Sequence, residues 1–474
     1  MGKLLKTFGI YFAGNIINRL MGFVVMSIAT YKILPADYGY FNVASSLMNI
    51  IITLVSVQAW MAVLRFVFDY DRPHQKRQVI ATGYFIEIVA FLVYSIGFWI
   101  VCLIVPIRDA LPLYIMGAAY VLVQNTTFTC RSLGQNRLYV FSGLFASVIY
   151  LLSCILFIFG FHMTSSALIL SMAMSYLAQG FFIELFLKSI RNFRFHDVNF
   201  KLAKKMLRYC IPTALNQGTW WINTQACTLI ITICINEAAV GIYSAASKMT
   251  SLITMIVMVF NLAFQEFTFS ISHNEKREKQ YNLALDYFIR FISCGMLLLL
   301  PVTSVLFNWI IGPDYEMGRS LVPLLYLATF LDALASFIGS IVQAEKKVNM
   351  MFLSQLIGAV ITIGVMLSSI WFIGLQSAAL AMFFCFLAIT ILRTIGLHPQ
   401  IRLHYDWKYF GHYTIVFLLA SGIYLFANQW MNLLFFFPLL GYVFLCLRKI
   451  IREFLSLVQH KFSKSTEPSN LERN

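Results

Sequence analysis

The sequence predicts an all-α polytopic membrane protein with about 14 transmembrane helices: two six-helix lobes in parallel repeat plus two C-terminal helices. Three observations lead to this fold class. Of 474 residues, 60% are hydrophobic and 12% are charged, which leaves too little polar surface to coat a water-soluble globule. Apolar runs long enough to cross a bilayer recur along the whole chain. Lysine and arginine are concentrated in alternate connections between these runs.

Fourteen apolar runs define the expected spans, since a bilayer core about 30 Å thick needs roughly 20 apolar residues per helix. They are centred near residues 20, 53, 92, 120, 150, 176, 221, 255, 295, 331, 362, 386, 419 and 440. The first run lacks a small-residue cleavage site, so we expect it to be retained as a span. The connections are short, and the longest, 188–208, has room only for an amphipathic link.

The basic residues orient these spans. If the N-terminus is cytoplasmic, the cytoplasmic segments hold 27 of the 35 lysines and arginines, and the opposite loops hold only Lys32, Arg108 and Arg319. Cytoplasmic loops of membrane proteins carry such an excess. We therefore expect both termini in the cytoplasm.

Several function classes are excluded. The net charge of +15 is explained by topology, so no nucleic-acid partner is expected. Nine cysteines stand singly, without the spacing of a disulfide framework or a zinc site. The chain contains no GxxxxGK[ST] sequence for ATP binding. We predict neither a cofactor nor a metal.

An internal repeat indicates a duplicated architecture. The segment Gly-Tyr-Phe-Asn-Val-Ala-Ser at 39–45 aligns with Gly-Ile-Tyr-Ser-Ala-Ala-Ser at 241–247, an offset of 202 residues. Because each block has six spans, the two should insert the same way up, related by an axis along the membrane normal. The predicted divisions are 1–200 and 201–400 for the two lobes, 401–452 for the last two spans, and 453–474 for a cytoplasmic tail.

Polar stripes at helical spacing follow the same offset. In the first half they comprise Asn15, Asn18, Arg19 and Gly22, and then Asn42, Ser45, Ser46 and Asn49. In the second half they comprise Gln217, Trp220, Trp221 and Thr224, and then Ser244, Ser247, Lys248 and Ser251. Small polar residues also serve helix packing, but stripes that carry a charge favour a water-filled cavity.

Charges within the spans fall into three groups. Arg65, Glu184, Glu266 and Arg393 stand near cytoplasmic ends, which their side chains can reach. Asp286 and Arg290, four residues apart, can neutralise each other. Arg19, Glu87, Lys248 and Asp332 lie deeper, where a charge costs on the order of 3 kcal/mol. Glu87 and Asp332 are candidates for ion coupling or an ion pair.

These residues carry a family resemblance. The opening Asn-x-x-Asn-Arg (15–19), Ile-Leu-Pro-Ala-Asp-Tyr-Gly-Tyr-Phe (33–41) and Val-Gly-Ile-Tyr-Ser-Ala-Ala-Ser-Lys (240–248) resemble bacterial polysaccharide flippases of the multidrug, oligosaccharidyl-lipid and polysaccharide exporter superfamily. The likeness implies a non-enzymatic, multi-pass inner-membrane protein. It would move a polyprenyl-diphosphate-linked oligosaccharide of O-antigen, capsule or exopolysaccharide by alternating access.

The implied substrate suits the stripes, because arginine and lysine can hold a diphosphate while amide and indole groups contact sugars. The predicted substrate-binding residues are Arg19, Lys248, Arg65, Arg290, Asn15, Asn18, Asn42, Gln217, Trp220, Trp221 and Asn223. Partners would be the lipid-linked substrate and membrane lipids, with a polysaccharide polymerase and chain-length proteins as further candidates. Two alternatives stay open: an ion-coupled multidrug or small-molecule exporter of the same fold, and an integral-membrane glycosyltransferase or polymerase.

Overall fold

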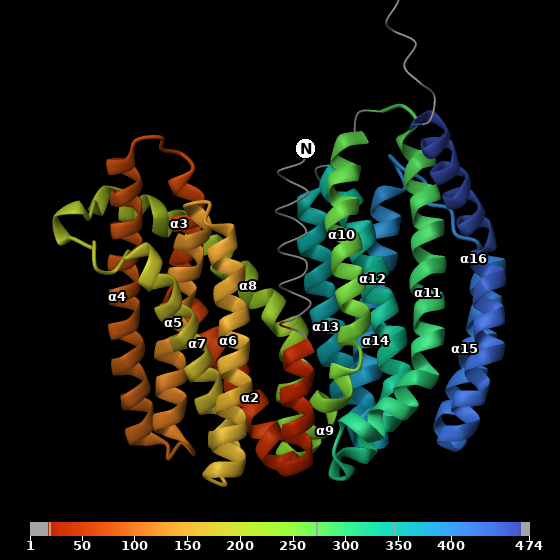
Figure 1. Cartoon of the computed structure of the whole chain (residues 1–474), viewed down its shortest axis with the longest axis horizontal. Helices are drawn as coiled ribbons and strands as arrows, with labels where there is room; N and C mark the ends of the chain where they lie inside the picture. The colour runs from red at the N-terminus through yellow and green to blue at the C-terminus, as the bar shows by residue number, and fades with distance from the viewer. Residues whose placement is uncertain (1–17, 19, 272–273, 346, 466–474) are drawn as a thin grey trace, which may run out of the picture. The chain divides into compact units, whose positions relative to one another are not determined.

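The computed structural model describes residues 18, 20–271, 274–345 and 347–465. Within this part the chain forms helices and no strand (Figure 1), and each of the fourteen predicted centres lies in a helix. Among the described residues, ten helices are long and apolar enough to span a membrane, or eleven if α9 and α10 count as one interrupted span. The predicted all-α, multi-pass fold class is thus confirmed.

The chain divides into two compact units. Unit 1 comprises Met1–Lys248, Ile310–Leu321 and Gln355–Cys385, and unit 2 comprises Met249–Trp309, Val322–Ser354 and Phe386–Asn474. The division into lobes at residues 200 and 400 stays a prediction.

Unit 1 contains a helix at Leu20–Lys32, the further helices up to Lys248, and one short helix from the second half of the chain. These are α2 (Pro35–Val55), α3 (Ala59–Val67), α4 (Pro73–Ile104), α5 (Ala110–Ser132), α6 (Asn136–Ile155), η1 (Leu156–Gly160), α7 (Ser165–Leu187), η2 (Phe195–Asp197), α8 (Phe200–Cys234), α9 (Glu237–Lys248) and η3 (Pro313–Leu321). Unit 2 contains α10 (Ser251–Ile271), α11 (Arg277–Ile310), α12 (Val322–Ala344), α15 (Trp407–Phe426) and α16 (Gln429–Ser465). Helices α13 (Val348–Ile373) and α14 (Gln376–Leu397) contribute residues to both units.

Local sequence signals explain several helix starts. Proline occupies the first turn of α2 and of α4, where its missing N–H removes no intrahelical bond. The Asn199 side chain accepts hydrogen bonds from the backbone N–H groups of Lys201 and Leu202 at 3.0 and 3.1 Å. It therefore caps α8.

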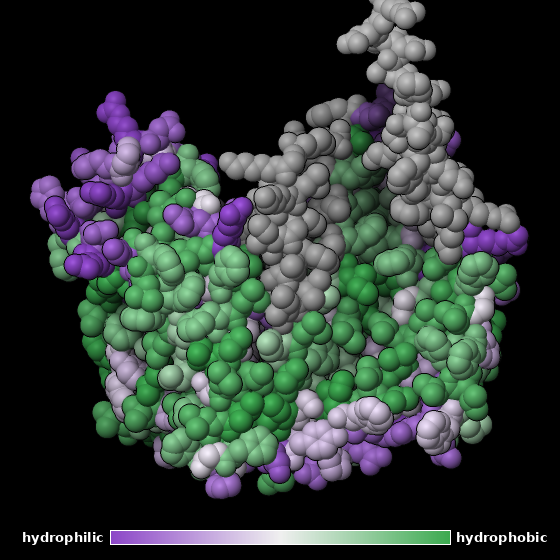
Figure 2. All heavy atoms as spheres, viewed as in Figure 1, coloured by the Kyte–Doolittle hydropathy of each residue, from purple (hydrophilic) through white to green (hydrophobic). Residues whose placement is uncertain are grey.

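Helix α4 has one buried face and one exposed aliphatic face. Gly83, Glu87, Ala90 and Tyr94 are buried along one side, whereas Ile88, Val89, Leu92, Val93 and Ile96 on the other are 40–62% exposed. An exposed aliphatic stripe of this length suits hydrocarbon rather than water. Figure 2 shows such hydrophobic residues coating the flanks of the helices, with hydrophilic residues gathered toward the helix ends.

Helices α2 and α9 contact each other through the repeated glycines. A Cβ at Gly39 would stand 1.8 Å from the carbonyl oxygen of Glu237, and a Cβ at Gly241 would stand 2.0 Å from that of Pro35. The contact is reciprocal, because Gly241 and Glu237 follow Gly39 and Pro35 by the same 202 residues. Only glycine permits this approach of two backbones.

The second predicted span is broken rather than continuous. Helix α2 ends at Val55 and α3 begins at Ala59, while Val57 and Gln58 between them have φ angles of +49° and +54°. A left-handed conformation at a non-glycine residue costs about 1–2 kcal/mol. The surrounding contacts therefore hold a strained break inside a membrane span.

Candidate functional site

Two of the predicted polar stripes meet within unit 1, where α8 lies against α2. The indole N–H of Trp221 donates to the Ser46 hydroxyl at 3.1 Å and to the Ser46 carbonyl at 3.2 Å. Asn42 stands one turn earlier on α2 and donates to its own helix, at the Tyr38 carbonyl, 2.7 Å away. Gln217, one turn before Trp221, is half-buried. We call Asn42, Ser46, Gln217 and Trp221 the α2–α8 stripe.

Two other predicted amides contact further helices of unit 1. The Asn223 amide donates to the side-chain and backbone oxygens of Gln355 at 2.9 and 3.1 Å. The Asn18 side-chain oxygen accepts from the Ser147 hydroxyl at 2.8 Å. The sequence patterns do not reveal Gln355 or Ser147 as partners, since neither belongs to a repeated stripe.

Two of the predicted cations of unit 1 lie at helix ends. Arg65 is exposed in the last turn of α3, where it pairs with Asp69. Lys248 is exposed and ends α9. Three further predicted binding residues lie outside the described part of the chain, namely Asn15, Arg19 and the side chain of Trp220. The side chain of Glu266 also lies outside it.

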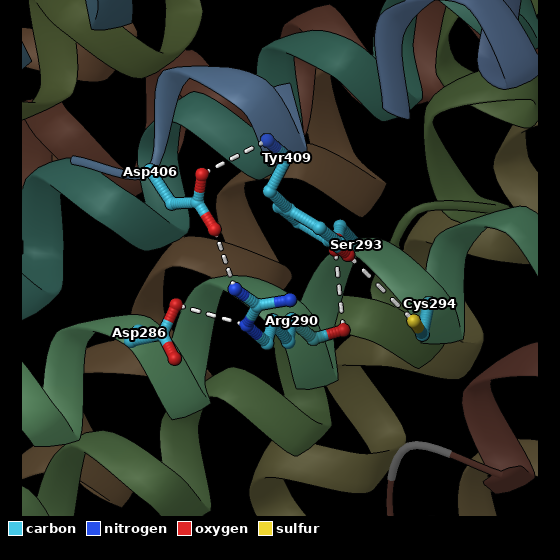
Figure 3. Close-up of polar contacts among 6 residues, drawn as sticks. All are labelled: Asp286, Arg290, Ser293, Cys294, Asp406 and Tyr409. Atoms are coloured by element: carbon cyan, nitrogen blue, oxygen red, sulfur yellow. Dashed lines mark hydrogen bonds and ion pairs between the residues drawn. The ribbon is translucent and has the colours of Figure 1, made fainter. Parts of the chain in front are cut away.

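Arg290 belongs to unit 2 and joins α11 to the start of α15 (Figure 3). Its guanidinium donates to Asp286 at 2.9 Å and to Asp406 at 2.7 Å, and it stacks 4.5 Å from the centroid of the Tyr409 ring. The predicted pairing with Asp286 is confirmed. Asp406, which the sequence patterns miss, is a second carboxylate partner of the same guanidinium.

A buried cluster of unit 2 contains Arg393. We expected this side chain to extend to the end of its span, but it is only 3% exposed. It donates to the Ser354 hydroxyl at 3.1 Å and to the Ala335 carbonyl at 2.7 Å. The carboxylate of Asp332 interacts electrostatically with the Arg393 guanidinium. Arg393 is therefore held inside the unit because α12 and α13 supply acceptors.

Polar side chains also bridge α10 and α12 in unit 2. Asn261 donates to the Ser336 hydroxyl at 2.8 Å, and Gln265 donates to Gln343 at 2.7 Å. Asn261 and Gln265 stand four residues apart, so the spacing used for the other stripes would have found them.

Glu87 differs from the other charged groups in the spans. Its side chain is 2% exposed, and neither carboxyl oxygen has a hydrogen-bond partner among the described residues. The Ser56 hydroxyl and the backbone of Trp60, at the break between α2 and α3, are the polar groups that act on it.

Loop charges at the opposite end of α2 form a paired cluster. Arg108 binds Asp37, and this hydrogen bond raises the pKa of the Arg108 guanidinium. Asp109 accepts from the hydroxyls of Ser165 and Ser166 at 2.7 Å. These contacts tie the connection between α4 and α5 to its neighbours.

The described polar residues of the stripes offer reversible hydrogen-bonding contacts. No group of three or more His, Cys, Asp or Glu that could hold a metal ion occurs among them. Two amides, one hydroxyl and an indole N–H belong to the α2–α8 stripe. Such groups can exchange their present partners for the hydroxyls of a polar ligand.

Residues 4–264 match the family described as "Polysaccharide biosynthesis protein". A relative, the amylovoran biosynthesis protein AmsL of Erwinia amylovora, is 27% identical over 168 residues, or 35% of this chain and 43% of that protein. The chain thus matches less than half of that relative's length.

Two solved structures share the fold. A structure of the lipid II flippase MurJ in an inward closed conformation has a TM-score of 0.71 at 15% identity, covering 94% of this chain and 99% of that one. An inward-facing multidrug resistance transporter of the MATE family has a TM-score of 0.65 at 14% identity, covering 81% and 94%. At these identities the likeness concerns the fold alone.

Proposed function

Since this chain belongs to the family of polysaccharide biosynthesis proteins, we propose that it is a flippase for a polyprenyl-diphosphate-linked oligosaccharide. The family and the fold are those of membrane transporters. The proposed substrate is a repeat unit of O-antigen, capsule or exopolysaccharide, moved from the inner to the outer leaflet of a bacterial inner membrane. The proposed mechanism is alternating access, with both termini in the cytoplasm and a polymerase or chain-length protein as candidate partner.

The family match over residues 4–264 is the observation that carries this proposal. A relative named for amylovoran biosynthesis and a fold shared with a lipid II flippase support it. The α2–α8 stripe supports a sugar substrate, since its amides and hydroxyl can bond sugar hydroxyls while Trp221 offers a ring face.

The diphosphate is assigned to Arg19 and Lys248. Moving its negative charge through a medium of low dielectric constant is costly, and fixed cations lower that barrier through charge-assisted hydrogen bonds. Arg65 and Arg290 already bind carboxylates, so they would have to exchange partners to contact substrate. They are assigned to entry or release.

Proteoliposomes containing a polyprenyl diphosphate with a labelled oligosaccharide test the proposal. The initial rate of translocation is the rate at which a membrane-impermeant glycosidase outside gains access to the label. Arg19→Ala and Lys248→Ala should each lower this rate about tenfold or more, because a hydrogen bond to a charged group contributes roughly 1.5–3 kcal/mol. Arg19→Lys should retain part of the rate, since the charge survives but the bidentate geometry does not.

The double substitution shows whether the two cations act on one diphosphate. If they do, Arg19→Ala with Lys248→Ala should lower the rate little further than either alone, because coupled residues are not additive. Arg191→Ala, in the exposed 188–199 connection, is the control and should leave the rate unchanged. Losses that multiply would separate the two sites.

A wild-type protein that leaves the lipid-linked sugar in place but extrudes organic cations would contradict this substrate. It would favour the multidrug exporter, the alternative that the likeness to a MATE transporter supports. Glycosyl transfer by the purified protein would instead identify an enzyme.

A further inference from the structure

The Glu87 carboxyl lies near the middle of the 32-residue helix α4, buried and without a hydrogen-bond partner among the described residues. Burying an ionised carboxylate without a partner is costly, so these surroundings favour the protonated acid. The Ser56 hydroxyl, 1% exposed, is likewise unpartnered in the described structure. Two orphaned polar groups thus lie together at the break between α2 and α3.

The amino-terminal end of α3 faces this carboxyl. Two polar groups interact electrostatically with the Glu87 carboxyl: the backbone of Trp60, in the first turn of α3, and the Ser56 hydroxyl. A helix amino terminus carries partial positive charge and free N–H groups. The two helices are close here, because a Cβ at Gly83, one turn before Glu87, would stand 2.1 Å from Val63 Cγ2.

We propose that Glu87 is a proton-carrying residue that couples transport to a proton gradient, and that the break at 56–58 responds to its charge. This inference rests on the proposed function as a transporter. When the Glu87 O–H bond breaks, the proton leaves to the side of the membrane then accessible. The carboxylate attracts the Ser56 hydroxyl and the amino terminus of α3, and a proton taken up later restores the acid and releases them.

The ligand is a proton rather than a metal cation because of the groups that surround the carboxyl. Ser56 presents a hydroxyl that can donate, and Trp60 presents a backbone N–H. A bound cation is instead coordinated by several oxygen lone pairs. Positive helix-end charge also repels a cation while it stabilises a carboxylate.

Other titratable and charged groups come from the elements packed against α4, which are α2, α3, α5, α8 and η2. The Cys210 thiol of α8 faces Glu87 and donates to the Gln58 carbonyl at 3.4 Å. The charged side chains of these elements have other neighbours or are exposed. Asp37 binds Arg108, Arg65 binds Asp69, and His196 lies by Asp197. Arg131 stacks on Phe128, and Lys205 lies over Phe66. Lys201, Lys204 and Arg208 are exposed. Glu87 therefore has no fixed counter-ion among them, and its charge must change with its proton.

A pocket of about 320 Å³ brings polar surroundings close to Glu87. It begins near Asp71 and Lys76 at the start of α4, and Tyr84 is the residue of α4 furthest along the helix that lines it. Tyr84 stands three residues before Glu87, on the same side of the helix. Along α4, the lining of this pocket therefore ends one helical turn before Glu87.

Infrared spectroscopy tests the titration without any substrate. The difference spectrum of the purified protein between acid and alkaline buffer should show the carbonyl band of a buried protonated carboxyl group. Glu87→Gln should remove the Glu87 component of this band, and Glu184→Gln should leave the band unchanged. Glu184 is a matched control because Ser189 and the backbone N–H of Ile190 already bond its carboxylate. An unchanged band in Glu87→Gln would overturn the proposal.

Proteoliposomes with a pH gradient test the coupling. With one proton exchanged per substrate molecule, a difference of about one pH unit across the membrane allows the substrate to accumulate about tenfold in one leaflet over the other. Wild type should approach this ratio, whereas Glu87→Gln should only equalise the leaflets and Glu87→Asp should keep the coupling at a lower rate. A tenfold ratio in Glu87→Gln, or coupling to a sodium gradient instead, would overturn the proposal.

The two measurements separate this inference from the proposed function. A titrating Glu87 band in a protein that moves no lipid-linked sugar would refute the substrate and leave the proton site standing. Translocation that ignores the pH gradient would uphold the flippase and refute the role of Glu87.

Discussion

Asp406 holds the start of α15 through two different contacts. Its carboxylate accepts from the backbone N–H of Tyr409 at 3.1 Å and from Arg290 at 2.7 Å. The bond from the Tyr409 amide, followed by the charge of Arg290, holds the pKa of Asp406 below its ordinary value. A carboxyl with a lowered pKa stabilises the fold at pH values above the unfolded pKa, and this contribution is lost as the pH falls through the folded value.

Asp406→Asn isolates the ion pair, because asparagine can still cap the Tyr409 amide. At pH 7 the substitution should lower the free energy of unfolding by on the order of 1 kcal/mol or less, since both side chains are partly exposed. The difference from wild type should begin to shrink as the pH falls below about 4, the ordinary pKa of aspartate, and should vanish below the lowered pKa of the folded state. Thermal unfolding in detergent micelles at several pH values measures it, and a difference that stays constant down to pH 3 would rule out the ion pair as its cause.

The sequence predicts residue contacts well only where both partners share one helix. Asp286 and Arg290 are four residues apart, so their pairing follows from helical geometry. The buried position of Arg393 depends instead on acceptors from Ser354 and Ala335. Such contacts require knowledge of which helices are neighbours, and the periodicity of one helix does not contain it.

At the scale of helices, the close contact between α2 and α9 depends on two glycines that the repeat relates. Gly39→Ala and Gly241→Ala should each destabilise the protein by about 1–3 kcal/mol, because the new methyl group meets a backbone carbonyl that has no side-chain freedom to move away. The melting temperature in detergent micelles measures the effect. The double variant should lose less than the sum, since separation of the helices by one methyl group makes room for the other.

Gly97→Ala on α4 is the matched control. A Cβ at Gly97 has no heavy atom within 4 Å among the described neighbours, so alanine should be neutral or raise stability by up to about 1 kcal/mol through its helix propensity. Equal losses of stability in all three variants would mean that the close approach of α2 and α9 does not cause the effect.

The positions of the helices were predictable because hydropathy reports burial in lipid directly, and each predicted centre lies in a helix. The break between α2 and α3 was not, because Ser56, Val57 and Gln58 include neither glycine nor proline. Two residues adopt the left-handed conformation there despite its cost. Tertiary contacts impose that geometry, and one of these is the bond from Cys210 to the Gln58 carbonyl.

For the whole molecule, the charge bias predicts on which side of the membrane each loop lies. His196→Cys, in the 188–199 connection, should react with a membrane-impermeant maleimide only from the cytoplasmic side. Met317→Cys, in η3, should react only from the opposite side. Both positions are exposed, and the nine native cysteines are buried or half-buried, which keeps background labelling low. Reaction of both from the same side would refute the predicted alternation of spans.

The fold class and the family were predictable for this chain, because composition, repeated spans and ordered motifs all extend over long stretches. The site was less so. Two of the predicted stripes contact each other at Trp221 and Ser46, but the pairing of these two residues was not predicted. The partners Gln355 and Asp406 come from segments whose own patterns carry no such signal.

The reciprocal glycine contact also constrains how the two repeats can change. In a symmetric homodimer, residue i of one subunit touches residue j of the other, and j touches i. Gly39 with Glu237 and Gly241 with Pro35 repeat this relation inside one polypeptide. The contact therefore has the self-complementary form of a subunit interface, although both of its surfaces belong to one chain. A substitution at either glycine needs a change in the opposite repeat to make room for the new side chain.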